Sequence, residues 1–198
     1  MKWENVCRPK EFGGLGLLNT RYMNIALLLK WIWKLFNNAD DAPWLQILKN
    51  KYLRNGESIP MNNSRGSQFW NGLQSVKHWF VWGAIHTVGD GRATRFWHDV
   101  WIGNVPFKLA FPSLFWAAEA PEFSVAANYD TDVHLWDVKF KRSFGVDDMQ
   151  LWEFLLAKLD HVFLSDQEDR VRWALEKNGE YSSKSMYKWL SFQGVSDP

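Results

Sequence analysis

The sequence predicts a mainly helical α+β fold, with four or five helices, two small β-hairpins and a core rich in tryptophan. Two observations carry this prediction. Apolar residues recur at helical spacing in several stretches of the chain. The dipeptides Asp90-Gly91 and Asn178-Gly179 each lie between strand-like residues, which is typical of tight hairpin turns. With 46% hydrophobic and 23% charged residues, the 198-residue chain has the composition of a globular domain.

Polar residues mark where the expected helices begin. The first helix covers residues 21–36, with Asn19 or Thr20 as its N-cap. It is apolar around most of its circumference, so we expect it to be buried on more than one side. A short helix is expected near residues 113–118. The other expected helix starts are Asp41 (with Pro43 in the first turn), Ser67, Asp147 or Asp148, and Ser183 or Ser185.

The two expected hairpins are placed by their turns. Residues 86–88 would pair with residues 94–97 across Asp90-Gly91, and the strand near residues 169–173 would pair with the residues after Asn178-Gly179. By sequence pattern the chain divides into three segments, which we expect to form one compact unit. These are a basic helical segment with a hairpin (1–102), an irregular connector (103–135), and a segment with a helix, a hairpin and the C-terminal helix (136–198).

The 14 tryptophans allow two interpretations. They can build a core of large rings, or they can offer stacking platforms for bases or sugars. Most of them lie at helical or strand spacing, which favours the core.

Cysteine content and hydropathy exclude several classes of protein. The single cysteine, Cys7, can form neither an internal disulfide nor a cysteine-rich zinc site. The most apolar run, residues 25–36, contains two lysines and is too short to cross a membrane. With no signal peptide evident, we expect an intracellular protein, nuclear or cytoplasmic, without a membrane partner.

The net charge of +1 is unevenly distributed. Residues 1–100 hold 13 Lys and Arg against 7 Asp and Glu, whereas residues 101–198 hold 10 against 15. The basic half can face a polyanion, or it can dock on the acidic half; the sequence leaves both open.

No catalytic pattern is evident. The five histidines have no metal-ligand spacing, and the chain has no phosphate-binding loop and no nucleophile motif. Gly89-Asp90-Gly91 lacks the third glycine and the following helix of a dinucleotide fingerprint. We therefore expect no enzyme activity, no cofactor, no metal and no small-molecule substrate.

The best binding candidate is the basic and aromatic cluster around residues 92–98. Arg92 and Arg95 could hold phosphates while Phe96 or Trp97 stacks on a base. Alternatively, both rings anchor the core, and the arginines are solvated or pair with Asp90 and Asp99. A second basic strip would consist of Lys10, Arg21, Lys30 and Lys34.

Nine short stretches, taken in order, resemble plant LINE-type (non-LTR) retrotransposon polyproteins, in the region downstream of the reverse-transcriptase core. The resemblance covers nearly the whole chain. The stretches are CRPKEFGGLGLLN (7–19), ALLLKWIWKL (26–35), LKNKY (48–52), FW (69–70), VGDG (88–91), RFWHDVW (95–101), FPSLF (111–115), DRVRW (169–173) and YSSKSMY (181–187).

The resemblance implies a connector between the polymerase and a downstream zinc-binding segment, often followed by ribonuclease H. Asn38-Ala39-Asp40-Asp41 departs from the family's aromatic-Ala-Asp-Asp box, and we expect Asp41 to cap a helix instead. No catalytic residue of the family has a matching position here. The implied function is a non-catalytic fragment with weak nucleic-acid binding, with RNA or DNA and the reverse-transcriptase core as partners.

The alternative is a structural or protein-interaction module without a nucleic-acid role. It predicts that Trp97 is buried and that an apolar groove lies beside Leu28, Trp31 and Leu35.

Overall fold

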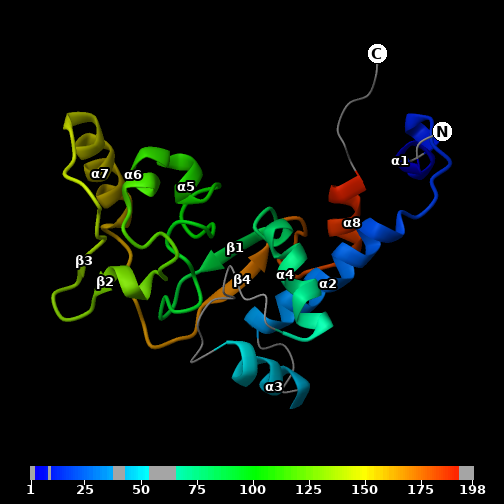
Figure 1. Ribbon diagram of the computed structural model, residues 1–198, viewed down its shortest axis with the longest axis horizontal. Coiled ribbons are helices and arrows are strands. Elements are labelled where there is room, and N and C mark those ends of the chain that lie inside the picture. The colour runs from blue at the N-terminus through cyan, green and yellow to red at the C-terminus, as the bar shows by residue number, and fades with distance from the viewer. Residues whose placement is uncertain (1–2, 9, 38–42, 54–65, 192–198) are drawn as a thin grey trace. The chain divides into compact units, whose positions relative to one another are not determined.

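The computed structural model describes residues 3–8, 10–37, 43–53 and 66–191 (Figure 1). It is mainly helical, with two small two-stranded sheets, which confirms the predicted α+β class. The chain forms two compact units: unit 1 comprises residues 1–33, 64–83 and 173–198, and unit 2 comprises residues 34–63 and 84–172. Each unit combines segments far apart in the sequence, so the unit boundaries do not coincide with residues 102 and 135, where the sequence pattern changes.

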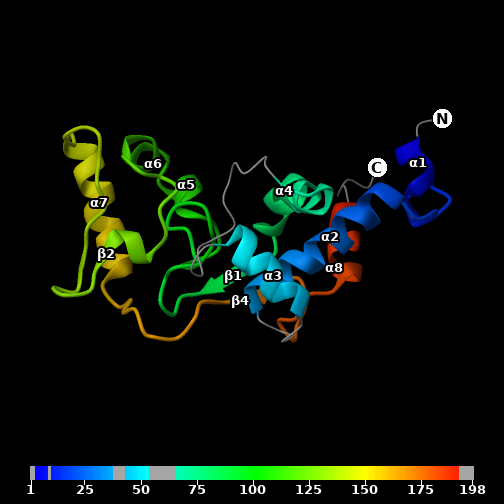
Figure 2. The same cartoon turned by 60° about the horizontal axis from the view of Figure 1, so that its bottom comes forward.

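Unit 1 is helical. Its elements are α1 (Trp3–Cys7), a 3-10 helix (Lys10–Phe12), α2 (Thr20–Asn37, whose residues from Lys34 onward belong to unit 2), α4 (Gln68–Phe80) and α8 (Ser183–Ser191). In both views α2 and α8 lie side by side (Figures 1 and 2). None of the described helices combines the length and hydrophobicity that crossing a bilayer requires.

Two predicted helix starts of unit 1 are confirmed. Asn19 Oδ1 accepts hydrogen bonds from the backbone N–H groups of Arg21 (3.1 Å) and Tyr22 (3.3 Å), which starts α2. Ser67 Oγ accepts from Trp70 N at 3.3 Å and starts α4. These short-range bonds satisfy N–H groups that the helix itself cannot pair.

The core of unit 1 is built around Trp173, which is fully buried. Its ring contacts Trp33, Phe80 and Tyr181, with centroid distances of 6.3, 5.7 and 4.7 Å. Its Nε1 donates to Ser185 Oγ at 3.0 Å, so the one polar atom of the indole is paired inside the core. Three segments of unit 1 therefore meet at one tryptophan.

Unit 2 contains short helices and both sheets. Its elements are α3 (Pro43–Tyr52), β1 (Ala84–Thr87), α5 (Phe107–Ala110), α6 (Pro112–Ala117), a 3-10 helix (Ala126–Asn128), β2 (Tyr129–Asp130), β3 (Leu135–Trp136), α7 (Val146–Leu159) and β4 (Arg170–Trp173, whose last residue belongs to unit 1).

The predicted cap Asp41 lies outside the described residues. Helix α7 begins after Gly145 without a side-chain cap, and Asp147 and Asp148 lie in its first turn, where carboxylates favour the helix dipole. The prediction that one of them is the N-cap is therefore wrong.

Both predicted hairpins are wrong. Strand β1 pairs with β4, not with residues 94–97. Residues 94–96 instead bond to residues 123–125: Phe96 N donates to Phe123 O, and Val125 N donates to Thr94 O. A turn does form at Gly179, which has a positive φ of 74°, and Trp173 N donates to Gly179 O there. No strand follows it among residues 180–182, and α8 begins at Ser183.

A hairpin does occur at the end of the segment predicted to be an irregular connector (103–135), and its second strand extends one residue beyond that segment. Strands β2 and β3 are antiparallel, with Tyr129 opposite Trp136 and Asp130 opposite Leu135. The turn contains His134 at a positive φ of 54°. Each strand is only two residues long, which is too short to give an alternating sequence pattern.

The core of unit 2 is aromatic and aliphatic. Ten buried residues form one cluster: Phe96, Trp97, Phe107, Phe111, Leu114, Ala118, Val125, Val138, Leu155 and Leu159. They come from the loop after β1, from α5 and α6 and the residue after each of them, from the residue before the 3-10 helix, from the segment after β3 and from α7. The burial of both Phe96 and Trp97 in this cluster determines what the predicted binding site can do.

Candidate functional site

The glycine loop, residues 88–94, is held by one buried carboxylate. Asp169 Oδ1 accepts hydrogen bonds from Gly89 N (2.7 Å) and Gly91 N (2.9 Å). Its Oδ2 accepts from Ala93 N (3.0 Å) and Thr94 N (2.9 Å). Bonds from N–H groups to a carboxylate are stronger than neutral ones, so a single side chain fixes the loop. Because these N–H groups bond to Asp169, they are not available to the ladder of the predicted hairpin.

Arg95, one of the predicted phosphate ligands, forms an internal ion pair. Its Nη2 lies 2.6 Å from Asp99 Oδ1, and its Nε donates to Asp99 Oδ2 at 3.2 Å. Burial by itself would raise the pKa of Asp99, but the charge and hydrogen bonds of Arg95 outweigh it and lower that pKa to about 2. The guanidinium is therefore committed to Asp99, as the alternative interpretation of this cluster predicted.

Two histidines adjoin this pair. His86 Nδ1 lies 3.2 Å from Thr94 Oγ1, and burial lowers the pKa of His86. His98 Nε2 lies 3.0 Å from Glu122 Oε1, and its Nδ1 lies 3.3 Å from Lys108 Nζ. Burial also lowers the pKa of His98; Glu122 opposes this shift, and the charges of Arg95 and Lys108 add to it.

The two predicted stacking residues lie in the core. Phe96 and Trp97 are each 0% exposed, and their rings meet edge to face at 5.0 Å. A base could stack on either ring only if this core opened. The burial of Trp97 is what the alternative, a structural module, predicted.

The other predicted contacts are at or near the surface. The side chain of Arg92 is 67% exposed and lies 3.8 Å from Asp90 Oδ2. Lys34, half-buried in unit 2, has its Nζ 6.0 Å from the centroid of the Trp44 ring. Lys10 is exposed in the 3-10 helix of unit 1. Nucleic-acid binding by these residues stays a prediction, for which Arg92 and Lys10 offer accessible charge.

The described part of the chain contains no cluster of three or more His, Cys, Asp or Glu side chains with the arrangement of a metal site. The polar groups around Asp169 and Asp99 bond mainly to one another and to the backbone. The bonds of Asp169 hold together two segments of unit 2 that are far apart in the sequence.

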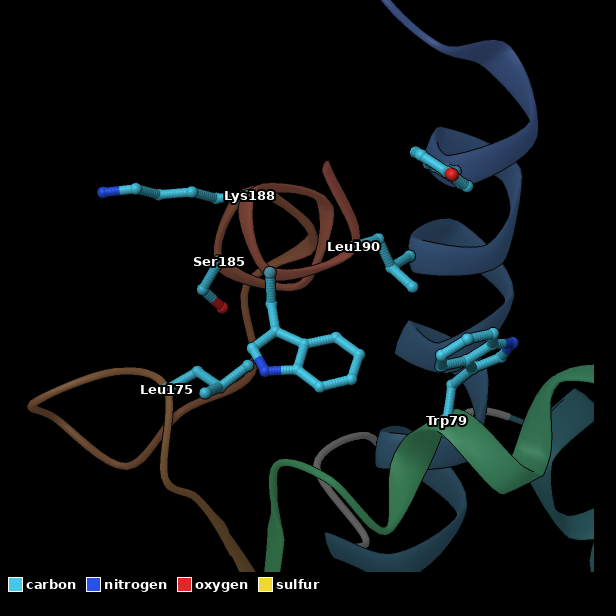
Figure 3. Close-up of a pocket in the computed structure, with 7 residues that line it drawn as sticks. Trp79, Leu175, Ser185, Lys188 and Leu190 are labelled. Atoms are coloured by element: carbon cyan, nitrogen blue, oxygen red, sulfur yellow. The ribbon is translucent and has the colours of Figure 1, made fainter. Parts of the chain in front are cut away.

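A pocket in unit 1 was not anticipated. It has a volume of about 600 Å³ and is lined by Tyr22, Trp79, Leu175, Ser185, Lys188, Trp189 and Leu190. Trp79 comes from α4, whereas Ser185, Lys188 and Leu190 come from α8 (Figure 3). We call it the α4–α8 pocket. The predicted groove beside Leu28, Trp31 and Leu35 is not this pocket, because only Tyr22 of α2 lines it. In the sequence, the adjacent residues Lys188 and Trp189 were a signal that could have pointed to this pocket.

Folding concentrates positive charge in unit 1. Its described residues include four acidic ones, Glu4, Glu11, Glu176 and Glu180. The same residues include eight basic ones: Arg8, Lys10, Arg21, Lys30, Lys77, Lys177, Lys184 and Lys188. The basic character predicted for residues 1–100 is thus shared by the C-terminal helix α8.

By these features the chain is an aromatic-rich α+β protein. Most of its buried charged groups bond to other residues of the same chain. Over its whole length the chain is similar to a "Putative ribonuclease H protein" of Arabidopsis thaliana, with 29% identity over 209 aligned residues. It spans 32% of that protein, about a third of its length. An "Uncharacterized mitochondrial protein" of the same plant is 28% identical over 102 residues, which are 50% of this chain and 66% of that protein.

No family model and no solved structure matches the chain. The two similarities support the coarser part of the resemblance, a relationship to plant proteins of the retroelement type.

Proposed function

We propose that this chain is a non-catalytic connector derived from a plant LINE-type reverse-transcriptase polyprotein, with weak affinity for nucleic acid. The single observation that carries the connector role is the convergence of two of the resemblance stretches. VGDG (88–91) and DRVRW (169–173) are 78 residues apart, yet Asp169 of the second binds Gly91 of the first. Residues of both stretches therefore have a structural role in the fold.

The ordered stretches and the similarity to a plant protein named for ribonuclease H support the retroelement origin. That protein is about three times as long as the aligned chain, which leaves room for other domains beside a connector. The absence of enzyme activity is part of the proposal. It can be tested by incubating the purified chain with a labelled RNA–DNA hybrid in Mg²⁺ or Mn²⁺. We expect the hybrid to stay intact; cleavage that is lost on changing one acidic side chain contradicts the proposal.

The excess positive charge of unit 1 favours the nucleic-acid part of the proposal. The test is the fluorescence anisotropy of labelled single-stranded RNA at about 25 and about 200 mM salt. If about three phosphates are contacted, log K should fall with log salt with a slope of roughly −2. A lack of binding at micromolar protein in low salt rejects this part of the proposal.

A second candidate is a structural or protein-interaction module without any nucleic-acid role. The burial of Phe96 and Trp97, together with the Arg95–Asp99 pair, favours it, because the best sequence candidate for a stacking site is used internally. The same binding experiment separates the two candidates, since this module should not bind RNA at either salt concentration.

A further inference from the structure

Three tryptophan rings of unit 1 meet at the α4–α8 pocket. Trp189 stacks on Trp82, with centroids 5.9 Å apart and an interplanar angle of 27°. Trp189 also meets Trp79 edge to face at 6.0 Å. Trp82, just after the end of α4, is 59% exposed. Three indoles therefore form a continuous series that reaches from the pocket lining to solvent.

Trp3 and Trp31 of unit 1 are also exposed, at 54% and 37%, but three other tryptophans of this unit are buried. Trp70 and Trp173 are 0% exposed and Trp33 is 6% exposed, so their rings are used in packing. Trp82 offers apolar area at the surface that the fold itself does not cover. Exposed rings of this kind, when grouped, mark binding surfaces.

The pocket has the size and lining of a ligand site. A volume of about 600 Å³ falls within the range of small-ligand pockets, roughly 300–1,000 Å³. Most of its lining is apolar, and Leu175 and Leu190 adjoin the rings. Figure 3 shows Lys188 extending outward from α8, away from Trp79. A flat ring could thus lie against the indoles while a charged group reaches the lysine.

The charge beside the pocket is positive. Lys184 and Lys188 are four residues apart on α8, so they lie on the same face of the helix, and both are exposed. Among the residues that the structure describes, no carboxylate forms an ion pair with either lysine. The nearby Glu176 accepts a hydrogen bond from Ser182 Oγ at 2.6 Å. The two ammonium groups are therefore available to a polyanion.

We propose that the α4–α8 pocket binds single-stranded nucleic acid. One base lies in the pocket against Trp189 and Trp79, and the neighbouring base stacks on Trp82. Lys184 and Lys188 hold the phosphates between and beside these bases. Stacking on aromatic rings beside a basic track is how single strands bind without sequence preference. This inference rests on the nucleic-acid part of the proposed function and gives it a location.

The test measures the anisotropy of a labelled RNA of about 12 nucleotides and of an abasic strand of equal length and charge. We expect the wild-type chain to bind the RNA more tightly. Trp82→Ala should weaken RNA binding by roughly five- to a hundredfold and leave abasic binding nearly unchanged. Lys188→Ala should weaken binding to both strands and reduce the salt slope by roughly 0.7.

Two matched variants in unit 2 serve as controls. Trp116→Ala removes a ring that is 77% exposed, and Lys141→Ala removes one exposed charge. Far-UV circular dichroism spectra should be the same for all four variants as for the wild type, because each changed side chain is exposed. Each tryptophan variant loses one ring contact, with Trp189 or with Phe115, so the two should be destabilised by similar small amounts. Neither control should change the preference for RNA over the abasic strand.

The outcomes separate the two proposals. If the wild type binds neither strand, the nucleic-acid part of the proposed function fails and this inference fails with it. If it binds both strands equally, or if Trp116→Ala weakens RNA binding as much as Trp82→Ala, the pocket assignment is wrong while nucleic-acid binding stands. If Trp82→Ala leaves RNA binding unchanged but abolishes self-association in sedimentation, the pocket is a protein interface and the assignment is wrong.

Discussion

The carboxylate of Asp169 accepts a hydrogen bond from the backbone N–H of Gly91, 78 residues earlier in the chain, at 2.9 Å. Three further N–H groups of the same loop bond to this side chain. The loop therefore depends on a residue that no local pattern links to it.

Replacing Asp169 with Asn should destabilise the chain strongly. The amide offers one acceptor oxygen and turns a donor toward two of the four N–H groups, which leaves buried donors without partners. We expect a loss of roughly 3 kcal/mol or more in the free energy of unfolding. Urea unfolding measures this loss. Asp166→Asn, three residues earlier and exposed, is the control and should stay within about 0.5 kcal/mol of the wild type.

Replacing Arg95 with Met should change the pH dependence of stability. In the wild type the folded-state pKa of Asp99 is about 2, below its ordinary value of 3.8. The pair therefore stabilises the fold fully above about pH 4, and this contribution is lost as the pH falls through about 2. In Arg95→Met the carboxylate stays buried without its counterion, so its pKa should rise. We expect a loss of roughly 3–5 kcal/mol at pH 7, and this deficit should shrink as the pH falls toward 4.

Unfolding curves at several pH values check this prediction. Arg92→Met is the matched control, because Arg92 is exposed and should give a small, pH-independent change. A deficit in Arg95→Met that stays constant between pH 7 and 4 would show that the ion pair does not control the titration of Asp99.

The two buried histidines should make the fold sensitive to mild acid. The folded-state pKa values of His86 and His98 are lowered, chiefly by burial, so both rings stay neutral in the fold while the unfolded chain takes up protons below about pH 6.5. Stability should fall between pH 7 and 5 by up to about 1.4 kcal/mol per pH unit for each histidine. His86→Gln should flatten this slope. His161→Gln, whose side chain is 91% exposed, should leave the slope as it is.

Two glycines of unit 1 should respond to alanine in opposite directions. A Cβ at Gly83 would lie 2.5 Å from Cη2 of Trp173, so Gly83→Ala should cost roughly 1–3 kcal/mol through overpacking. A Cβ at Gly72, inside α4, would lie 3.8 Å from the nearest Leu28 carbons, an ordinary contact. Gly72→Ala should stabilise by roughly 0.5–1 kcal/mol because it reduces the freedom of the unfolded chain. Thermal unfolding measures both changes, and destabilisation by Gly72→Ala would contradict the packing described for α4.

The sequence predicted well where the cause of a structure is local. Helix α2 was expected over residues 21–36 and covers Thr20–Asn37, and its cap Asn19 acts on the next two or three residues. The start of α4 after Ser67 follows from the same short-range bonding. The hairpins were wrong because their turns were recognised while their partners were not. Strand β1 pairs with β4, about 80 residues away, and nothing within a short window encodes that choice.

The candidate site shows the same difference between what local sequence predicts and what long-range contacts decide. The residue types around Arg92–Trp97 suited either a nucleic-acid contact or a core, since Phe, Trp and Arg serve both. The structure places Phe96 and Trp97 in the core and Arg95 against Asp99. It places an exposed ring elsewhere, at Trp82, which stacks on the partly buried Trp189 of a segment that local reasoning does not connect to it.

By itself, the sequence determined the α+β class, most helix boundaries, the lack of any internal disulfide, and an ordered set of stretches that resembles plant retroelement polyproteins. Periodicity, caps and composition act over a few residues and can be interpreted directly. Only the tertiary structure decided which tryptophans are buried, which arginine is committed to a carboxylate, and which strand β1 joins. Those outcomes depend on groups as far apart as Trp33 and Trp173 in the sequence, which compete for the same hydrogen bonds and the same apolar space.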